Sequence, residues 1–225
     1  MSRSRSWLAV VALFALMACG DDNDSSSAGR VRVAHLSPDA GTLQLVVNGQ
    51  VVLNGFTYPN SSNYFDVNAG TREVRLEPNG GGTPFLSQNV EITGAEDRTL
   101  LAVNTAANME GVDLTDDNTA PVSGHVKVRL VHAVPSVGAV DIYVTAPGAA
   151  LGTPTVANVP FKGASAYLDL AAGSYEFRVT PAGSATVLID QTQSLLAGYI
   201  VTIAAREANG GGEPLGYALF LDRTP

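Results

Sequence analysis

Val-Arg-Val-Ala-His at residues 31–35 recurs as Val-Arg-Leu-Val-His at residues 128–132. Alternate side chains of a strand share one face, so the two Val positions and the His of each stretch would lie together. A second block recurs in the same order, and Tyr64, Asp66, Ala69, Gly70, Glu73, Arg75 and Pro78 match Tyr167, Asp169, Ala172, Gly173, Glu176, Arg178 and Pro181. Two repeated blocks in one order predict a tandem duplication of a domain of about 95 residues.

The pattern within each copy predicts strands. Val140, Ile142 and Val144 alternate with polar or aromatic residues, as Tyr175 and Phe177 do further on, and a period of two is typical of a half-buried strand. Clusters of Gly, Pro, Asn and Ser recur between these runs, as in β-sandwiches. We therefore predict an all-β fold of two tandem antiparallel, immunoglobulin-like β-sandwich domains. A small barrel is the alternative.

The repeats divide the chain into four parts. We expect a signal peptide at 1–18, a flexible tether at 19–29, and sandwich domains at 30–122 and 123–225. The boundary between the domains falls within residues 111–124, which include the polar stretch 116–121, and Asp116 has a counterpart in Asp222 at the end of copy two. Each copy has enough alternating strands for a core of its own, so we expect each to fold alone.

The N-terminus has the features of an exported lipoprotein. Arg3 and Arg5 precede the uncharged apolar run 7–17, which is too short to span a membrane and fits a signal peptide. The run ends in Leu-Met-Ala-Cys-Gly at 16–20, a sequence similar to a bacterial lipobox, and Cys19 is the only Cys of the chain. Lipidation of Cys19 accounts for an unpaired thiol in an exported protein. Ordinary cleavage beside an incidental Cys is the alternative.

Charge restricts the partners. Loss of Arg3 and Arg5 would leave 11 basic against 21 acidic residues, a formal charge of −10. Such a surface repels phosphate backbones, so we expect no nucleic-acid partner. We expect the protein to be attached to the membrane through its lipid anchor.

The residue after the lipobox bears on which membrane holds the protein. Asp21, two residues after Cys19, favours inner-membrane retention in some bacteria. We expect a bacterial cell-envelope protein at the outer membrane, with the periplasmic face of the inner membrane as the alternative.

The opening stretches 31–40 and 128–137 resemble the bacterial domain-of-unknown-function family 4397. The Tyr-x-Asp, Ala-Gly and Arg block and the Asp-Asp…Pro linker resemble this family too, and the resemblance covers residues 30–225. It implies an extracytoplasmic β-domain, implies no activity, and gives no catalytic residues to transfer. Copy two departs from copy one at Ser136, where copy one has Asp39. That difference weakens a role for Asp39 common to both copies.

His35 and His132 are the first candidates for chemistry. Ser37 and Asp39 follow His35, but Ser37 becomes Val134 in copy two, and a catalytic triad needs nucleophile, base and orienting acid in contact. His35 continues the row that begins with Val31 and Val33, which favours a semi-buried His bonded to the backbone. We expect no catalytic residue and predict that the protein is not an enzyme.

The block from Tyr167 to Arg178 predicts a hairpin. A four-residue loop at 171–174 would set Leu168 opposite Phe177 inside and Tyr167 opposite Arg178 outside, with Asp169 facing Glu176. Copy one has the same residues in Tyr64, Asp66, Glu73 and Arg75. We therefore expect structural roles for the residues that occur at matching positions in both copies. They are His35, His132, Tyr64, Asp66, Arg75, Tyr167, Asp169 and Arg178.

Three further features are interpreted as structural. His125 has no counterpart in copy one, and the three His of the chain show no metal-ligand spacing, so we expect no metal and no cofactor. The Gly-rich stretches 79–82 and 209–212 lack the Lys of a phosphate-binding loop and predict turns. The tether carries three Asp without the Gly and Glu of a calcium loop.

These features leave three hypotheses for function. The leading one is a non-enzymatic envelope lipoprotein that serves as a spacer, an adhesion module or a protein-binding module. The second is a carbohydrate- or small-ligand-binding module of a polymer-processing system, for which outward Tyr143 and Asp141 offer a recognition patch. The third is a hydrolase. Envelope protein or glycan partners follow from the first two.

Overall fold

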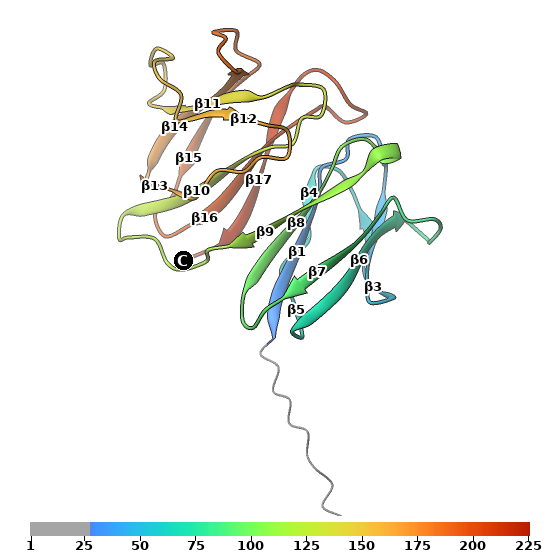
Figure 1. The fold of residues 1–225 in the computed structure, drawn as a ribbon. Helices are drawn as coiled ribbons and strands as arrows, with labels where there is room; N and C mark the ends of the chain where they lie inside the picture. The colour runs from blue at the N-terminus through green and yellow to red at the C-terminus, as the bar shows by residue number, and fades with distance from the viewer. Residues whose placement is uncertain (1–27) are drawn as a thin grey trace, which may run out of the picture.

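The computed structural model describes residues 28–225 (Figure 1). The expected signal peptide, Cys19 and most of the expected tether lie outside the described residues. Over the described part the chain is all-β apart from one short 3-10 helix. No helix among the described residues has the length and apolar character needed to cross a membrane.

The strands fall into two series, one for each copy. Copy one contains β1 (Gly29–His35), β2 (Leu43–Val47), β3 (Gln50–Phe56), β4 (Asn60–Ser61), β5 (Phe65–Val67), β6 (Gly70–Pro78), β7 (Leu86–Ile92), β8 (Asp97–Val103), the helix η1 (Ala106–Asn108) and β9 (Glu110–Asp116). Copy two contains β10 (His125–His132), β11 (Val140–Thr145), β12 (Val156–Val159), β13 (Leu168–Ala171), β14 (Gly173–Pro181), β15 (Ile189–Leu195), β16 (Ile200–Arg206) and β17 (Gly216–Arg223).

Each copy forms two sheets with the same strand order. Copy one has β3-β2-β6-β7 in its outer sheet and β4-β1-β8-β9 in its inner sheet, where β5 also pairs with β1; copy two has β12-β11-β14-β15 and β13-β10-β16-β17. The pairs β1–β8 and β10–β16 are parallel, and the other pairs are antiparallel. The predicted antiparallel β-sandwiches are confirmed. The one parallel pair in each copy is an addition, because parallel neighbours are joined through a long connection that local pattern does not reveal.

Each sandwich encloses its own apolar core. In copy one Val31 and Val33 of β1 lie against Leu45 of β2 and Leu76 of β6, all at most 1% exposed. In copy two Leu130, Ile142, Phe177 and Val179 occupy the same place. The period-two rows read from the sequence therefore point inward, and the residues between them are left for the opposite face of each sheet.

A third core joins the two copies. It consists of residues on the outward faces of the two inner sheets, and its buried members are Ala34, Leu36, Leu101, Val103, Val131, Ala133, Ala204, Ala218 and Phe220. Figure 1 shows β8 and β9 beside β16 and β17, with the outer sheets on either side. The molecule is thus four sheets stacked in one body. Independent folding of each copy stays a prediction. A separated copy would expose its part of the shared core to water and should therefore be less stable than the same copy in the whole chain.

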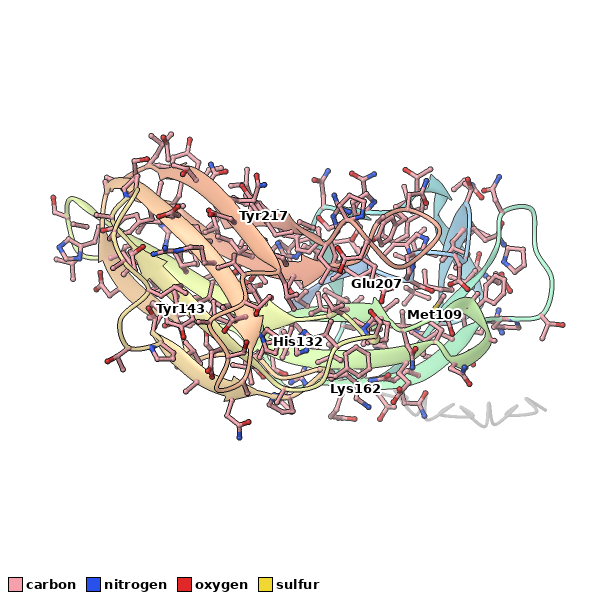
Figure 2. The ribbon with its side chains drawn as sticks, turned by 90° about the horizontal axis from the view of Figure 1, so that it is seen from above. Met109, His132, Tyr143, Lys162, Glu207 and Tyr217 are labelled. Carbon is pink, nitrogen blue, oxygen red and sulfur yellow. The ribbon has the colours of Figure 1, made fainter. Side chains whose placement is uncertain are left out.

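Loops of copy two extend the contact to copy one. The Nζ atom of Lys162 lies 2.6 Å from a carboxylate oxygen of Glu110. Tyr58 donates a hydrogen bond of 2.5 Å to the backbone carbonyl of Glu207, and the guanidinium of Arg206 lies 5.6 Å from the centre of the Tyr58 ring. Lys162 and Glu207 lie between the two copies in Figure 2. These exposed and half-buried contacts surround the shared core.

The predicted hairpin from Tyr167 to Arg178 is wrong. Strand β13 pairs with β10 in the inner sheet, whereas β14 pairs with β11 and β15 in the outer sheet. Arg178 lies opposite Tyr143 on β11 instead of Tyr167, and Glu176 lies opposite Thr145. The connection after β13 crosses from one sheet to the other, and a short loop between two alternating runs fits either a hairpin or such a crossing.

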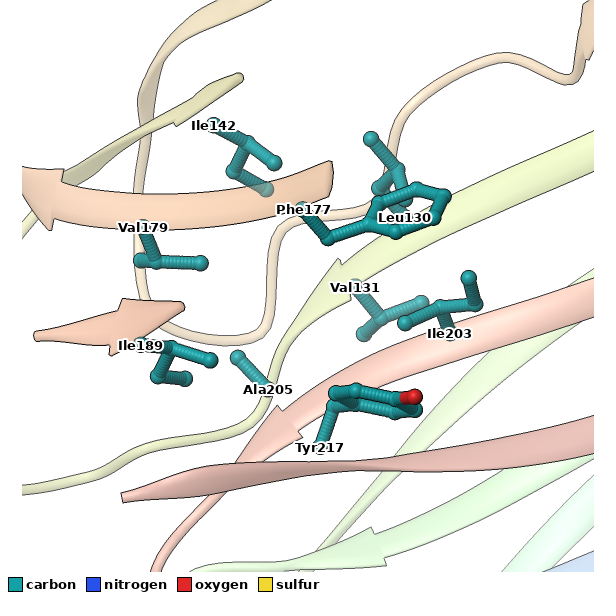
Figure 3. A pocket seen from close by; sticks show the side chains of 9 residues that line it. All are labelled: Leu130, Val131, Ile142, Phe177, Val179, Ile189, Ile203, Ala205 and Tyr217. Carbon is teal, nitrogen blue, oxygen red and sulfur yellow. The ribbon is translucent and has the colours of Figure 1, made fainter. Parts of the chain in front are cut away.

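The core of copy two contains a small void, shown in Figure 3. Its volume is about 20 Å³, and apolar side chains such as Leu130, Phe177 and Ile203 line it. A void of this size has room for about one water, and its lining is almost wholly apolar. It is a packing defect and no ligand site.

Candidate functional site

Two buried ion pairs cross from one copy to the other. In the first, Arg32 of β1 donates from Nη2 to Oδ1 of Asp222 at the end of β17, at 2.7 Å. The other carboxylate oxygen of Asp222 accepts hydrogen bonds of 2.8 Å from Tyr167 and from Thr202. Arg32 also donates to the carbonyl of Leu221. Arg32 is 1% exposed, and the Asp222 side chain is fully buried.

The second pair repeats the first with the copies exchanged. Arg129 of β10 donates from Nη2 to Oδ1 of Asp116 at the end of β9, at 2.5 Å. The second oxygen of Asp116 accepts hydrogen bonds of 2.6 Å from Tyr64 and Thr99. Arg129 also donates to the carbonyl of Thr115. Equivalent residues of both copies thus make equivalent contacts, and the contact between the copies has approximate two-fold symmetry.

We call the two ion pairs, with the Tyr and Thr side chains bound to them, the interdomain cluster. Its two Arg charges are balanced by its two Asp charges. Burial alone would lower the pKa of Arg32, but the carboxylate of Asp222 leaves that pKa above its ordinary value. Burial raises the pKa of both Tyr64 and Tyr167, so both phenols stay protonated and donate to the carboxylates. A site of general acid–base catalysis needs a group that exchanges protons near the working pH. This cluster instead holds the copies in a fixed orientation.

The repeated Tyr and Asp residues belong to this contact and its border. The guanidinium groups of Arg32 and Arg129 each lie 4.9 Å from the ring centre of the Tyr of their own copy, Tyr64 and Tyr167. Asp66 of β5 lies opposite Arg30 of β1 in the antiparallel register of the two strands. Asp169 lies 2.5 Å from Nδ1 of His125 at an exposed edge. Each Tyr therefore supports, from within its own copy, an Arg and an Asp that form the ion pairs between the copies, a role that the hairpin prediction does not include.

The repeated Arg residues lie far from the Tyr residues, in the outer sheets. Nη1 of Arg75 is 3.8 Å from Glu73, and Nη2 of Arg178 is 3.7 Å from Glu176. Arg178 also donates to Oγ1 of Thr145 at 2.9 Å. The block that repeats as one unit in the sequence is therefore divided between two faces of each sandwich.

His35 and His132 are fully buried at the ends of β1 and β10. Nε2 of His35 lies 3.0 Å from the carbonyl of Gly41, and Nε2 of His132 lies 2.9 Å from the carbonyl of Gly138. In both residues Nδ1 lies 3.4 Å from a backbone N–H two residues on. A carbonyl only accepts, so Nε2 carries the proton and Nδ1 accepts. Both rings are neutral, and their hydrogen bonds connect the end of the strand to the loop that follows it.

The residues near His35 do not form a triad. The amide of Ser37 faces Nδ1 of His35, while its hydroxyl is buried and has no hydrogen-bond partner among the described residues. Asp39 accepts a hydrogen bond of 2.7 Å from the amide of Ala106 and so fixes the start of η1. The acid therefore does not orient the imidazole, as the triad mechanism requires.

The buried histidines predict acid sensitivity. Burial lowers the pKa of His35 and of His132 below the ordinary value, against the opposing effect of their backbone hydrogen bonds. The unfolded chain then binds protons that the folded chain does not, so stability is full above the unfolded pKa of about 6.5 and falls below it. The melting temperature should fall between about pH 7.5 and about pH 5.5. The double variant His35→Gln, His132→Gln should show a shallower fall; equal slopes would exclude these residues as the cause.

The recognition patch expected at Tyr143 and Asp141 does not exist as an exposed surface. Tyr143 is 5% exposed, opposite Arg178 on the neighbouring strand. Asp141 is 6% exposed and accepts hydrogen bonds of 2.8 Å from the amides of Asn158 and Gly183, which lower its pKa. Asp141 thus holds loops of copy two, and neither side chain is exposed to a partner.

The remaining candidates give no cofactor site. The stretches 79–82 and 209–212 connect β6 to β7 and β16 to β17, and their Gly residues have positive φ angles between 71° and 138°. Such angles suit tight turns. Across residues 28–225 there is no group of three or more His, Cys, Asp or Glu side chains placed to hold a metal ion.

The surface has two adjoining hollows beside the interdomain cluster. One, of about 330 Å³, opens between β3 and the β4–β5 segment and is lined by Leu45, Val52, Leu53 and residues 61–65. The other, of about 290 Å³, lies where that segment meets β17, and its lining includes Tyr64 and Leu221. Residues 40–65 contain no charged side chain. The first hollow is therefore neutral, with polar and apolar groups side by side.

Sequence reasoning missed the roles of Arg32, Arg129, Asp116 and Asp222. A signal was present, because an Arg stands between two apolar residues in the middle of both β1 and β10. The period of two places it opposite the core. A buried charge in each copy, together with a matching Asp at the end of each copy, would have indicated a polar contact between the copies.

Solved structures with some similarity to the chain include carbohydrate-binding modules. Family 41 carbohydrate-binding modules from streptococcal virulence factors, which recognise alpha-glucan, are 14% identical over 84% of this chain and 96% of that chain, with a TM-score of 0.26. A family 26 module from Eubacterium rectale, solved with maltoheptaose, is 8% identical over 87% and 98%, with a TM-score of 0.30. Scores this low assign no ligand to this chain.

No curated protein sequence matches the chain. A family model does match, over residues 29–143 and again over residues 128–224. The two matches overlap at residues 128–143 and together cover both sandwiches, which agrees with tandem copies of one domain. The chain belongs to the family described as domain of unknown function DUF4397.

Proposed function

We propose that this protein is a non-enzymatic lipoprotein of the bacterial cell envelope, in which two sandwich domains form one rigid spacer and protein-binding module. The observation that supports this function is the pair of buried Arg–Asp contacts between the copies. Arg32 meets Asp222 at 2.7 Å and Arg129 meets Asp116 at 2.5 Å, all four buried. A body of this kind keeps partners bound to the two copies at a fixed distance from each other.

The anchor in this proposal is a lipid on Cys19. The Cys19→Ser variant should release the protein from the membrane fraction or accumulate as a longer, unprocessed precursor. The reason is that Cys19 is the only Cys of the chain, so no other thiol is available for lipidation. Cell fractionation and mass spectrometry of the mature N-terminus give the measurement. A variant that fractionates and matures like the wild type would show that the anchor is elsewhere.

The spacer function is tested on intact envelopes. A cross-linker should join the wild-type protein to a defined envelope protein, and the Asp222→Ala variant, with a loosened contact between the copies, should give a different or weaker product. Glu110→Ala serves as the control, since it removes an exposed contact between the same copies. Turnover of an envelope substrate by the purified protein would contradict the non-enzymatic proposal.

A second candidate function is binding of a neutral ligand such as a carbohydrate, favoured by the uncharged hollow beside the β4–β5 segment. Hydroxyl and amide groups at 61–63 adjoin Leu45 and Leu53 there, a mixture that suits the polar edges and apolar faces of sugars. Calorimetry against neutral oligosaccharides tests it. Asn63→Ala should weaken binding roughly fivefold, whereas Asn89→Ala on β7 should not; absence of binding to every oligosaccharide rejects this candidate.

A further inference from the structure

Exposed apolar side chains gather at one end of the molecule. Six large hydrophobic side chains of the described residues are exposed, and three of these are Val122 at 63%, Leu196 at 59% and Leu221 at 51%. Val122 lies in the connection between the copies, Leu196 between β15 and β16, and Leu221 near the end of β17. Contiguous exposed apolar residues on a protein surface mark an interaction site.

Strand order places all three at the end where the chain enters the fold at Gly29. In copy one β1 and β8 run parallel and β9 ends beside the start of β8, because Asp97 lies opposite Asp116. In copy two the start of β16 lies beside the end of β17, because Ile200 lies opposite Arg223. Arg223 donates to the carbonyl of Asn118, whose side chain donates to Asp97.

We call this the entry end and define it by Gly29, the connection 117–124, the loop 196–199 and residues 221–225. Figure 1 shows the start of β1 and the C-terminus on the same side of the molecule. Asp222, beside Leu221, binds Arg32 in the middle of β1. The ends of both sandwiches are therefore held together by the contacts that fix their orientation.

The apolar side chains at the entry end surround an open hollow. Leu195, Leu196, Tyr199, Leu219 and Leu221 are among the residues that line a space of about 170 Å³, and most of its lining is apolar. The hollow opens into the core of copy two rather than into a polar cluster. Its chemistry suits hydrocarbon better than a charged or strongly hydrated ligand.

The charges at this end are compensated locally. Nη2 of Arg30 lies 2.5 Å from Asp97, and Nζ of Lys127 lies 2.7 Å from Asp117. These pairs reduce the repulsion that the acidic surface elsewhere exerts on anionic headgroups. The entry end thus differs from the protein as a whole, which carries a formal excess of acidic residues.

We propose that the entry end rests on the lipid surface to which the protein is anchored, with Leu196 and Leu221 in the interfacial layer and Val122 beside them. This inference depends on the proposed lipid at Cys19. Gly29 lies ten positions after Cys19, a reach of at most about 35 Å. The lipid therefore holds the membrane close to the end at which the exposed apolar side chains lie, and contact with the interface covers them.

The test uses the full lipidated chain in vesicles of phosphatidylethanolamine and phosphatidylglycerol with brominated acyl chains. Lipidation consumes the thiol of Cys19, so a single introduced Cys can carry a polarity-sensitive fluorophore. Labels on Leu196→Cys and Leu221→Cys should shift to the blue and be quenched by bromine. A label on Val187→Cys, which is 39% exposed and precedes β15 at its opposite end, should remain in water, with quenching lower by at least roughly twofold.

The outcomes separate this inference from the anchor itself. If the protein carries the lipid and stays with the vesicles, yet labels at 196 and 221 behave like the label at 187, the entry end does not touch the membrane. If mass spectrometry shows no lipid on Cys19 and the protein does not float with vesicles, the anchor proposal fails first. Blue shift and quenching at all three positions would also overturn the inference, because the contact would then not be specific to this end.

Discussion

Asp222→Ala should lower the free energy of unfolding by about 3–5 kcal/mol, because it leaves Arg32 charged and buried without its partner. Arg32 is 1% exposed, and Tyr167 and Thr202 each lose an acceptor that lies at 2.8 Å in the native protein. For a chain of this size the melting temperature should fall by roughly 10 °C. Thermal unfolding followed by circular dichroism gives the measurement.

Glu110→Ala is the matched control for this prediction. It too removes a carboxylate that meets a basic residue of the other copy, but Lys162 and Glu110 are 40% and 46% exposed in their side chains. An exposed pair contributes at most about 1 kcal/mol. Equal effects of Asp222→Ala and Glu110→Ala would mean that the buried contact does not stabilise the protein more than a surface pair.

Leu101→Ala should destabilise the protein by about 2–5 kcal/mol, since it opens a cavity in the core between the copies. Leu101 lies on β8, is fully buried, and packs in the shared core rather than in the core of its own sandwich. Because both copies contribute to that core, the whole chain should unfold at a lower temperature as one transition. Differential scanning calorimetry distinguishes this from loss of one domain alone.

The same substitution at Leu221 provides the comparison. Leu221 is 51% exposed, so Leu221→Ala removes little buried surface and should change stability by less than about 0.5 kcal/mol. If Leu101→Ala gives two separate transitions, one of them at the wild-type temperature, the copies do not share a core that couples their folding.

Local pattern was sufficient to predict the inside of each sandwich. The rows of Val31 and Val33, and of Phe177 and Val179, point into the cores as the period of two predicts, and the repeat correctly indicated two copies of one sandwich. Burial at these positions depends on which side of a strand a residue occupies. The alternation of apolar and polar residues indicates directly which side of the strand each residue occupies.

Contacts between sheets and between copies were not predictable in the same way. A short loop between two alternating runs predicts that Tyr167 pairs with Arg178, yet these runs belong to different sheets. The same pattern predicts Tyr143 on an open face, although Tyr143 is only 5% exposed. Both errors concern packing between elements distant in sequence, which a period of two does not specify. Cys19 lies outside the described residues, so its lipidation stays a prediction.

The two copies form one rigid body, and a distance measurement between spin labels tests this rigidity most directly. Labels on Val52→Cys in copy one and Val187→Cys in copy two replace exposed side chains, 45% and 39% exposed, in the chain with Cys19 lipidated and held in detergent. Double electron–electron resonance should give a single narrow distance distribution, which Asp222→Ala broadens. A broad distribution in the unaltered protein, as expected for two domains joined only by the connection 117–124, would contradict the account.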